Sequence, residues 1–176
     1  MLIPKYAKLE NERRFLVIDC PDLAATPCRL IEDLYLANSR MRLRSITDAE
    51  GQRELKLCKK YQSADPVSGP VVNLYLSPQE HALLSGLPGR PLRKRRYRTT
   101  WRGAVFGVDV FEGALEGLVL CEAEAESPDA IQAIAFPPWA AVDVTLDPFF
   151  TGGNLVQLAS PELKDRLARM REAASS

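Results

Sequence analysis

Charged side chains recur two residues apart in several stretches of this sequence. The acidic stretches contain Glu10, Glu12, Glu122 and Glu124, and the basic ones contain Arg42, Arg44, Lys94 and Arg96. Residues two apart on a β-strand share a face, so each pair can serve one site. Carboxylate pairs suit a hard divalent cation such as Mg²⁺ or Mn²⁺, and guanidinium groups bind phosphate oxygens through two parallel hydrogen bonds. The combination is typical of phosphoryl transfer, which needs the phosphate positioned, its charge neutralised and a water activated.

Most of the chain is predicted to form β-strands that would position these charges. About eight segments carry a strand pattern and are separated by turn-forming residues. They are Leu9–Ile18, Arg29–Ala37, Arg40–Thr47, Gln52–Lys60, Val71–Leu76, Leu92–Trp101, Ala104–Phe111 and Leu118–Ala125. Serine–proline signals predict short helices from Ser77 to about Ser85, from Ser127 to about Phe136, and from Ser160 onward. We therefore predict an α+β fold, mainly β, in which an eight-stranded antiparallel sheet closes into a barrel with a few helices packed outside. Residues 1–176 are expected to form a single domain.

The strand faces opposite the charges are more apolar. Phe15 and Val17 flank Leu16 on the first predicted strand, and Leu43 separates Arg42 from Arg44 on the third. If the apolar faces pack against outer helices, the charged faces point into the barrel, which is the reverse of an ordinary sheet protein. A lumen lined with Arg, Lys and Glu is costly unless it is hydrated and its charges are compensated. The compensation is either mutual or supplied by a ligand, such as a compact polyanion.

Two other interpretations of the charges compete with this one. Any single Glu-x-Glu or Arg-x-Arg pair is usually a solvated strand face, but here the pattern recurs on five predicted strands. The stretch Arg93–Arg98, with aromatic residues nearby, also resembles a nucleic-acid patch. Strand alternation, however, sends Arg93 and Arg95 to one side and Lys94 and Arg96 to the other. Only some of these cations can therefore serve a single site.

Composition indicates an ordinary folded protein with segregated charges. Of 176 residues, 46% are hydrophobic and 26% are charged, which excludes a disordered chain. Residues 1–102 carry 19 Lys and Arg against 11 acidic residues, whereas residues 103–176 carry 4 against 12. No apolar run is long enough for a membrane span, and the start does not have the pattern of a secretion signal. The four cysteines lack metal-binding spacing and His81 is the only histidine, so we expect no zinc site, reduced thiols and a cytoplasmic protein.

A series of short motifs runs in order along nearly the whole chain. It opens with Glu10-Asn11-Glu12-Arg13-Arg14 and continues with Tyr35-Leu36, Arg42-Leu43-Arg44, Leu55-Lys56, Lys94-Arg95-Arg96-Tyr97, Val108-Asp109-Val110-Phe111, Glu122-Ala123-Glu124, Phe136-Pro137-Pro138-Trp139 and Val144-Thr145. Together these motifs resemble the CYTH domain of the triphosphate tunnel metalloenzymes, whose opening signature is Glu-x-Glu-x-Lys. The resemblance implies an eight-stranded tunnel that binds a triphosphate end to end, as in inorganic triphosphatases, thiamine triphosphatases and class IV adenylate cyclases.

The resemblance also implies roles for individual residues. The predicted ligands of Mg²⁺ or Mn²⁺ are Glu10, Glu12, Glu122 and Glu124. The predicted phosphate-binding cations are Arg14, Arg42, Arg44, Lys56, Lys94 and Arg96. The predicted catalytic residues among these are Glu12, Arg14 and Lys56. Asp109 is predicted to lie near the metal or in a supporting ion pair.

Three departures from the family pattern bear on turnover more than on substrate binding. Arg14 stands where the family has lysine, so a forked group replaces a point charge. The predicted fifth strand has Val71–Leu74 where many members carry acidic residues, which removes metal-binding or water-positioning groups. Pro148–Gly153 replaces basic residues that commonly follow the Val-Thr motif.

The sequence therefore predicts a metal-dependent enzyme that hydrolyses inorganic triphosphate or a small organic triphosphate. The alternatives are a non-catalytic tunnel that binds triphosphate, polyphosphate or nucleotide, a class IV-type adenylate cyclase, and a nucleic-acid binder that uses Arg90–Arg102. The expected partner is a small triphosphate, with no membrane partner, nucleic acid disfavoured, and a homodimer as a possible assembly. Replacing Arg42 or Arg44 by alanine is expected to weaken triphosphate binding and to leave the fold intact or more stable, because like charges repel in an empty lumen.

Overall fold

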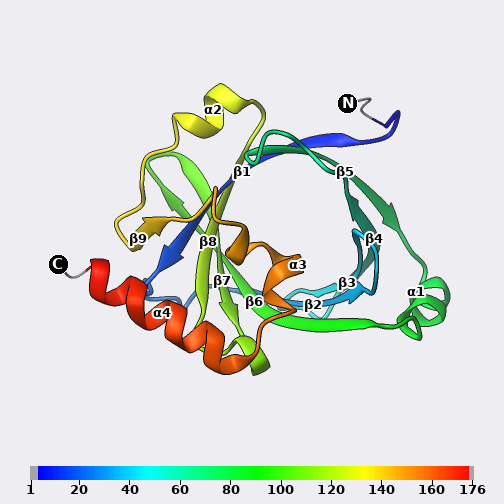
Figure 1. The fold of residues 1–176 in the computed structure, drawn as a ribbon. Coiled ribbons are helices and arrows are strands. Elements are labelled where there is room, and N and C mark those ends of the chain that lie inside the picture. Colours follow the sequence, from blue (N-terminus) through cyan, green and yellow to red (C-terminus); the bar gives the residue numbers. More distant parts are fainter. Residues whose placement is uncertain (1–3, 175–176) are drawn as a thin grey trace.

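A computed structural model describes residues 4–174, and its strands form one antiparallel sheet that closes on itself (Figure 1). The strands are β1 (Lys8–Val17), β2 (Cys28–Leu36), β3 (Met41–Thr47), β4 (Arg53–Lys60), β5 (Ser68–Tyr75), β6 (Gly89–Trp101), β7 (Ala104–Phe111), β8 (Val119–Ala125) and β9 (Ala140–Asp143). Their order around the sheet is β5-β4-β3-β2-β6-β7-β8-β1, and β9 pairs beyond β1. Most strand boundaries agree with the predicted ones to within one or two residues, and β9 was not predicted.

The ring closes because β1 has different partners along its length. Its start pairs with β5, where Lys8 lies opposite Val71. Its continuation pairs with β8, where Glu12 lies opposite Glu124. Closure gives every main strand a partner on both sides, which removes the exposed edges that an open sheet would present. The predicted eight-stranded antiparallel barrel is therefore confirmed.

Local sequence signals explain the turns and the first helix. The turn between β6 and β7 places Arg102 and Gly103 at positive φ, as the tightest right-twisted hairpin turns require. Helix α1 (Pro78–Ser85) begins with the predicted capping box, in which Ser77 and Glu80 each bond the other's backbone N–H. The C-terminal helix α4 (Ser160–Ala174) also starts where the Ser-Pro signal predicts.

The remaining helical segments differ from the prediction. Helix α2 (Pro128–Gln132) is shorter than predicted and ends four residues before Phe136, the residue that Pro137 keeps out of helical backbone. Three unpredicted short segments are η1 (Gly113–Leu115), η2 (Pro148–Phe150) and α3 (Gly152–Leu155). Among residues 4–174, no helix combines the length and apolarity needed to cross a membrane.

One apolar cluster covers the outer face of the barrel. Its buried members are Phe15, Val17, Phe106, Val108, Cys121, Ala123 and Ile131. Ile131 comes from α2, and Trp139, which leads into β9, packs against the same cluster. The outward side chains of β1, β7 and β8 are thus covered by α2 and the segment before β9. This arrangement leaves the alternate, charged positions of those strands for the inside, as the sequence predicts.

A second apolar cluster lies on the inner face, at one end of the barrel. Strand residues Leu16, Leu92, Phe111 and Leu120 share their faces with the charged residues and pack against the C-terminal segments. Those segments contribute Phe150, Leu155, Leu163 and Leu167. In Figure 1, α3 is drawn within the outline of the ring and α4 lies beside it. The interior is therefore apolar at this end and charged elsewhere, a division that the sequence analysis did not predict.

Gly152 explains how α3 can approach the strands so closely. A Cβ atom at this position would lie 1.9 Å from the hydroxyl oxygen of Tyr35 on β2. Any larger residue would therefore push α3 away from the barrel wall.

Candidate functional site

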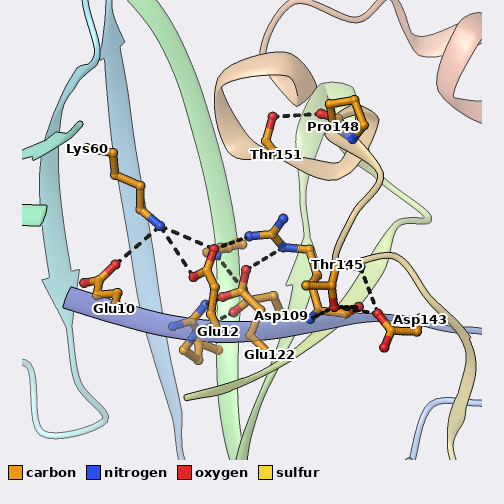
Figure 2. Close-up of polar contacts among 12 residues, drawn as sticks. Glu10, Glu12, Lys60, Asp109, Glu122, Asp143, Thr145, Pro148 and Thr151 are labelled. Atoms are coloured by element: carbon orange, nitrogen blue, oxygen red, sulfur yellow. Dashed lines mark hydrogen bonds and ion pairs between the residues drawn. The ribbon is translucent and has the colours of Figure 1, made fainter. Parts of the chain in front are cut away.

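The structure places the residues predicted from the sequence on the inner face of the barrel. The strand registers set Arg14 opposite Glu122 and Arg96 opposite Asp109, in alternation with the outward apolar residues. By the same registers the inner face carries Glu10, Glu12, Arg14, Arg42, Arg44, Lys56, Lys94, Arg96, Asp109, Glu122 and Glu124. In Figure 2 several of these side chains, from strands far apart in the sequence, converge above β1.

Arg14 stands at the centre of this group. Its side chain donates hydrogen bonds to Glu12 at 2.8 Å and to Glu122 at 2.9 Å. Its backbone N–H donates to the Thr145 hydroxyl at 2.9 Å, and its carbonyl accepts from the N–H of Val144. The chain after β9 is therefore fixed to β1 at the position of Arg14. These bonds hold the guanidinium in one orientation between two carboxylates.

Asp109 is completely buried and binds two of the predicted phosphate-binding cations. Arg96 donates two hydrogen bonds of 2.6 Å to its carboxylate, and Lys94 forms an ion pair with the same group. Arg96 also forms an ion pair with Glu122. Asp109 thus occupies the second of its two predicted positions, a supporting ion pair. It fixes Lys94 and Arg96 in the wall of the barrel.

Arg44 and Arg42 are neighbours on β3 with different environments. Arg44 forms a two-pronged ion pair with the buried Asp33 of β2, with both N···O distances at 2.6 Å. Arg42 has no carboxylate partner among the described residues, and it donates only to the hydroxyl of Tyr35 at 3.2 Å. The Nε atom of Arg42 is inaccessible to solvent and has no hydrogen-bond partner. Arg44 is therefore paired directly, whereas Arg42 is attracted to Asp33 only at longer range.

The predicted metal ligands do not form a ready metal site. Lys60 of β4 reaches between Glu10 and Glu12, with its Nζ 3.4 Å from Glu10 Oε2 and 3.4 Å from both carboxylate oxygens of Glu12 (Figure 2). Glu122 is engaged by Arg14 and Arg96, as described above. Glu124 makes no hydrogen bond or ion pair with the described residues. In the part of the chain between residues 4 and 174, no three acidic, histidine or cysteine side chains lie as a metal would need them.

Lys56 lies apart from the other predicted catalytic residues. It donates a 2.8 Å hydrogen bond to Glu54, two residues before it on β4, and its ammonium lies over the ring of Tyr75. Among the described residues, its ion-pair partner is Glu54, whereas Glu12 pairs with Arg14. The structure therefore brings Glu12 and Arg14 together and leaves Lys56 at another part of the wall.

The ion pairs shift the pKa values of the carboxyl groups. Burial alone would raise the pKa of Glu122, but the charges of Arg96, Lys94 and Arg14 outweigh it and hold that pKa well below its ordinary value. In the same way, Arg44 holds the pKa of the buried Asp33 carboxyl below its ordinary value.

Glu124 behaves in the opposite way. Its side chain stays open to solvent, yet partial desolvation, followed by the negative charge of Glu10, raises its pKa. No cation between residues 4 and 174 contacts this carboxylate directly. The region around Glu10, Glu12 and Glu124 therefore retains an excess of negative charge.

Four residues that contribute to the site were absent from the predicted set. Asp33, Tyr35 and Lys60 bind predicted residues through their side chains, and Thr145 binds the backbone of Arg14. Lys60 shares the inward face of β4 with Lys56, so strand alternation could have included it. Asp33 carried a weaker signal, because no second acid lies two residues from it on β2 and its position alone does not reveal which cation it will meet.

The basic stretch on β6 divides between the two faces as alternation predicts. Arg93 and Arg95 lie outside, where Glu112 binds both, at 2.7 Å and 2.6 Å. Lys94 and Arg96 lie inside with Asp109. Of the five cations in Arg93–Arg98, two are thus ion-paired with Glu112, two are directed into the barrel, and Arg98 is exposed.

The arrangement suits a small, highly charged anion together with a cation. A guanidinium without a counter-ion offers donors to phosphate oxygens, and carboxylates without a cation offer oxygen ligands to a divalent metal. Both lie on the inner wall of a closed barrel. Catalysis of this type consists largely of positioning the group and stabilising its charge.

Comparisons with known proteins agree with this chemistry. The chain is 33% identical over 146 residues to an inorganic triphosphatase from Nitrosomonas europaea, a match that covers 78% of this chain and 90% of the relative. A second inorganic triphosphatase, from Acetivibrio thermocellus, is 39% identical over 66 residues, covering 38% of this chain and 41% of that protein. No family model matches the chain.

Solved structures show the same fold. The crystal structure of an inorganic triphosphatase superimposes with a TM-score of 0.58 at 27% identity, covering 85% of this chain and 95% of the other. A putative adenylate cyclase from Bacillus halodurans has a TM-score of 0.50 at 14% identity, covering 73% of this chain and 86% of that one, which supports the fold alone.

Proposed function

This chain belongs to the family of the inorganic triphosphatase from Nitrosomonas europaea, and on that basis we propose that it hydrolyses inorganic triphosphate or a small organic triphosphate inside its barrel. In this proposal residues 1–176 form one domain of the CYTH-like tunnel type. The family relationship supports the reaction class, and the charged inner wall supports the location of the chemistry.

The observation that carries the proposal is a pair of opposite charges on that wall, Arg42 and Glu124, neither of which makes a direct ion pair with the described residues. Arg42 has no carboxylate partner and a buried Nε without a hydrogen bond. Glu124 has no cation partner, and its pKa is raised by partial desolvation and by the nearby Glu10. An anionic substrate would satisfy the first and a divalent cation the second, whereas a purely structural barrel would need neither.

The residues present fit a divalent metal by their chemistry. Glu10, Glu12 and Glu124 are oxygen ligands, which Mg²⁺ and Mn²⁺ both accept. Glu12 and Glu124 lie directly opposite each other on β1 and β8. Lys60, a cation of the protein, already lies between Glu10 and Glu12, which supports a place for positive charge there. We propose that these three carboxylates hold the metal, while Glu122 stays with Arg14 and Arg96.

The protein's own side chains would then bind and orient the substrate. Arg42 is the cation most available to the phosphates, and Lys56 adds an ammonium from the neighbouring strand. Arg14 is held between Glu12 and Glu122 in an orientation that keeps one guanidinium edge for the substrate. When bound, a divalent cation supplies neutralisation of phosphate charge and polarisation of the attacking water.

Hydrolysis is tested by phosphate release from the purified protein. We expect release from inorganic triphosphate in the presence of Mg²⁺ or Mn²⁺ and none after addition of a chelator. ATP and thiamine triphosphate, tested in parallel, define the substrate. Conversion of ATP to cyclic AMP without phosphate release would indicate the cyclase instead.

One observation favours a second candidate, a tunnel that binds triphosphate without hydrolysing it. The inward positions of β5 are Val71, Asn73 and Tyr75, so this strand contributes no carboxylate to the wall. Tight triphosphate binding without phosphate release would establish this candidate and contradict the proposed hydrolysis.

A further inference from the structure

Lys60 makes the loosest ion pairs in the acidic part of the inner wall. Its Nζ lies 3.4 Å from Glu10 and 3.4 Å from both oxygens of Glu12, whereas Arg14 bonds the same Glu12 at 2.8 Å. Its side chain keeps 43% of its surface exposed, compared with 9% for Arg14. Long contacts and exposure make these pairs weak in water. Lys60 is therefore the cation of this group that can leave at the least cost.

The position of Lys60 also limits how well one ammonium can satisfy its surroundings. Three carboxylates, those of Glu10, Glu12 and Glu124, share the region, and Lys60 contacts only the first two. Arg14 also bonds Glu12, but it is shared with Glu122, so the three carboxylates stay negative overall. A divalent cation brings twice the charge and prefers carboxylate oxygens, so it gains more from the same place.

The backbone of Lys60 is fixed while its side chain is free to move. The residue ends β4, where its N–H bonds the carbonyl of Arg40 and its register partner is Val71. A lysine side chain has a flexible four-carbon stem, so its ammonium can turn within a radius of several ångströms. It can therefore vacate the carboxylates without any change in the barrel.

We propose that Lys60 is a displaceable counter-ion, which occupies the carboxylates of Glu10 and Glu12 until a divalent metal replaces it. This inference rests on the proposed metal-dependent function. Displacement releases the ammonium of Lys60 from Glu10 and Glu12, so that it faces the bore. Entry of metal thus adds its own two positive charges to the wall and also leaves the ammonium of Lys60 free to contact a triphosphate. Lys60 acts here as a positioning residue that couples the two binding events.

The test is titration of the protein with Mn²⁺ in the absence of substrate. The concentration of free Mn²⁺ is measured at each step by electron paramagnetic resonance, which gives the dissociation constant. Lys60→Gln is expected to bind Mn²⁺ about five- to tenfold more tightly than wild type, because the competing ammonium is gone. Lys60→Arg keeps the charge and is expected to return the affinity toward the wild-type value. Equal or weaker Mn²⁺ binding by Lys60→Gln would overturn the inference and leave the proposed function standing.

Lys59→Gln is the matched control. Lys59 is the adjacent residue of the same strand, it is exposed on the outer face, and its ammonium lies over the ring of Tyr61. Its replacement removes the same charge from the chain without touching the carboxylates, so the Mn²⁺ affinity should stay at the wild-type value. If Lys59→Gln bound Mn²⁺ as tightly as Lys60→Gln, the gain in affinity would come from the net charge of the protein alone, and the inference would be contradicted. Absence of Mn²⁺ binding by the wild-type protein would instead overturn the proposed metal dependence itself.

Discussion

Replacing Glu12 by glutamine is expected to lower metal-dependent phosphate release by about a hundredfold or more. Glu12 is the carboxylate with the most functions on the inner wall, since it is a proposed metal ligand, orients Arg14 and contacts Lys60. Glutamine keeps the size of the side chain but loses the negative charge on which all three depend. The measurement is the initial rate of phosphate release at saturating metal and triphosphate.

The control for this variant is Glu50→Gln, which changes an exposed carboxylate in the turn between β3 and β4. Its rate should equal that of the wild type. A circular dichroism melt of both variants shows whether the fold is intact. A Glu12→Gln protein that is folded and retains more than half of the wild-type rate would contradict the assigned role.

Replacing Arg44 by alanine is expected to destabilise the protein by about 3–5 kcal/mol, because it leaves the completely buried carboxylate of Asp33 without a partner. Arg42→Ala removes no direct ion pair, only a hydrogen bond to Tyr35 and a longer-range attraction to Asp33, and is expected to destabilise the protein by about 1 kcal/mol, less than Arg44→Ala. The prediction from the sequence that both variants keep a stable fold is therefore revised for Arg44. Urea unfolding of the two variants at pH 7 measures the difference.

The double variant in which Asp33 and Arg44 are both replaced by leucine separates loss of the pair from loss of packing. It should recover most of the stability, because a buried ion pair can often be replaced by apolar side chains without cost. Equal stability of Arg44→Ala and Arg42→Ala would contradict the distinction between the two arginines. Arg42→Ala is also expected to weaken triphosphate binding roughly tenfold or more, since it removes a charge-assisted donor.

Period-two alternation predicted the most reliable features of the fold and of the site. In Arg42-Leu43-Arg44 the register of one strand decides the face of all three side chains, and the apolar Leu43 must be covered from outside. The same rule separated Arg93 and Arg95 from Lys94 and Arg96. These assignments needed no knowledge of distant contacts, because each depends only on neighbouring residues.

Partners across the barrel could not be predicted in this way. Arg42 and Arg44 have the same pattern in the sequence, yet only Arg44 meets Asp33, because the β2–β3 register sets these two opposite each other. Lys60 and Glu12 are 48 positions apart, and closure of the ring brings them together. The first contact depends on the exact register of one hairpin and the second on closure of the whole barrel, and the charge pattern of a single strand contains neither.

Local sequence patterns also did not predict that the C-terminal segments η2 and α3 pack inside the barrel. Pro148–Gly153 looked only like a loss of basic residues, whereas Phe150 packs inside the apolar end of the barrel and Gly152 allows α3 to approach Tyr35. Segments as short as η2 and α3 have too few residues to show a periodic pattern. Their packing role is therefore recognised only together with the strands that they cover.

The most direct measurement is a crystal structure of the protein with Mn²⁺ and triphosphate, with anomalous scattering recorded at the manganese edge. We expect an anomalous peak among Glu10, Glu12 and Glu124, and a triphosphate along the inner wall in contact with Arg42. Triphosphate bound at the outer arginines Arg93 and Arg95, or an empty barrel at saturating ligand, would contradict it.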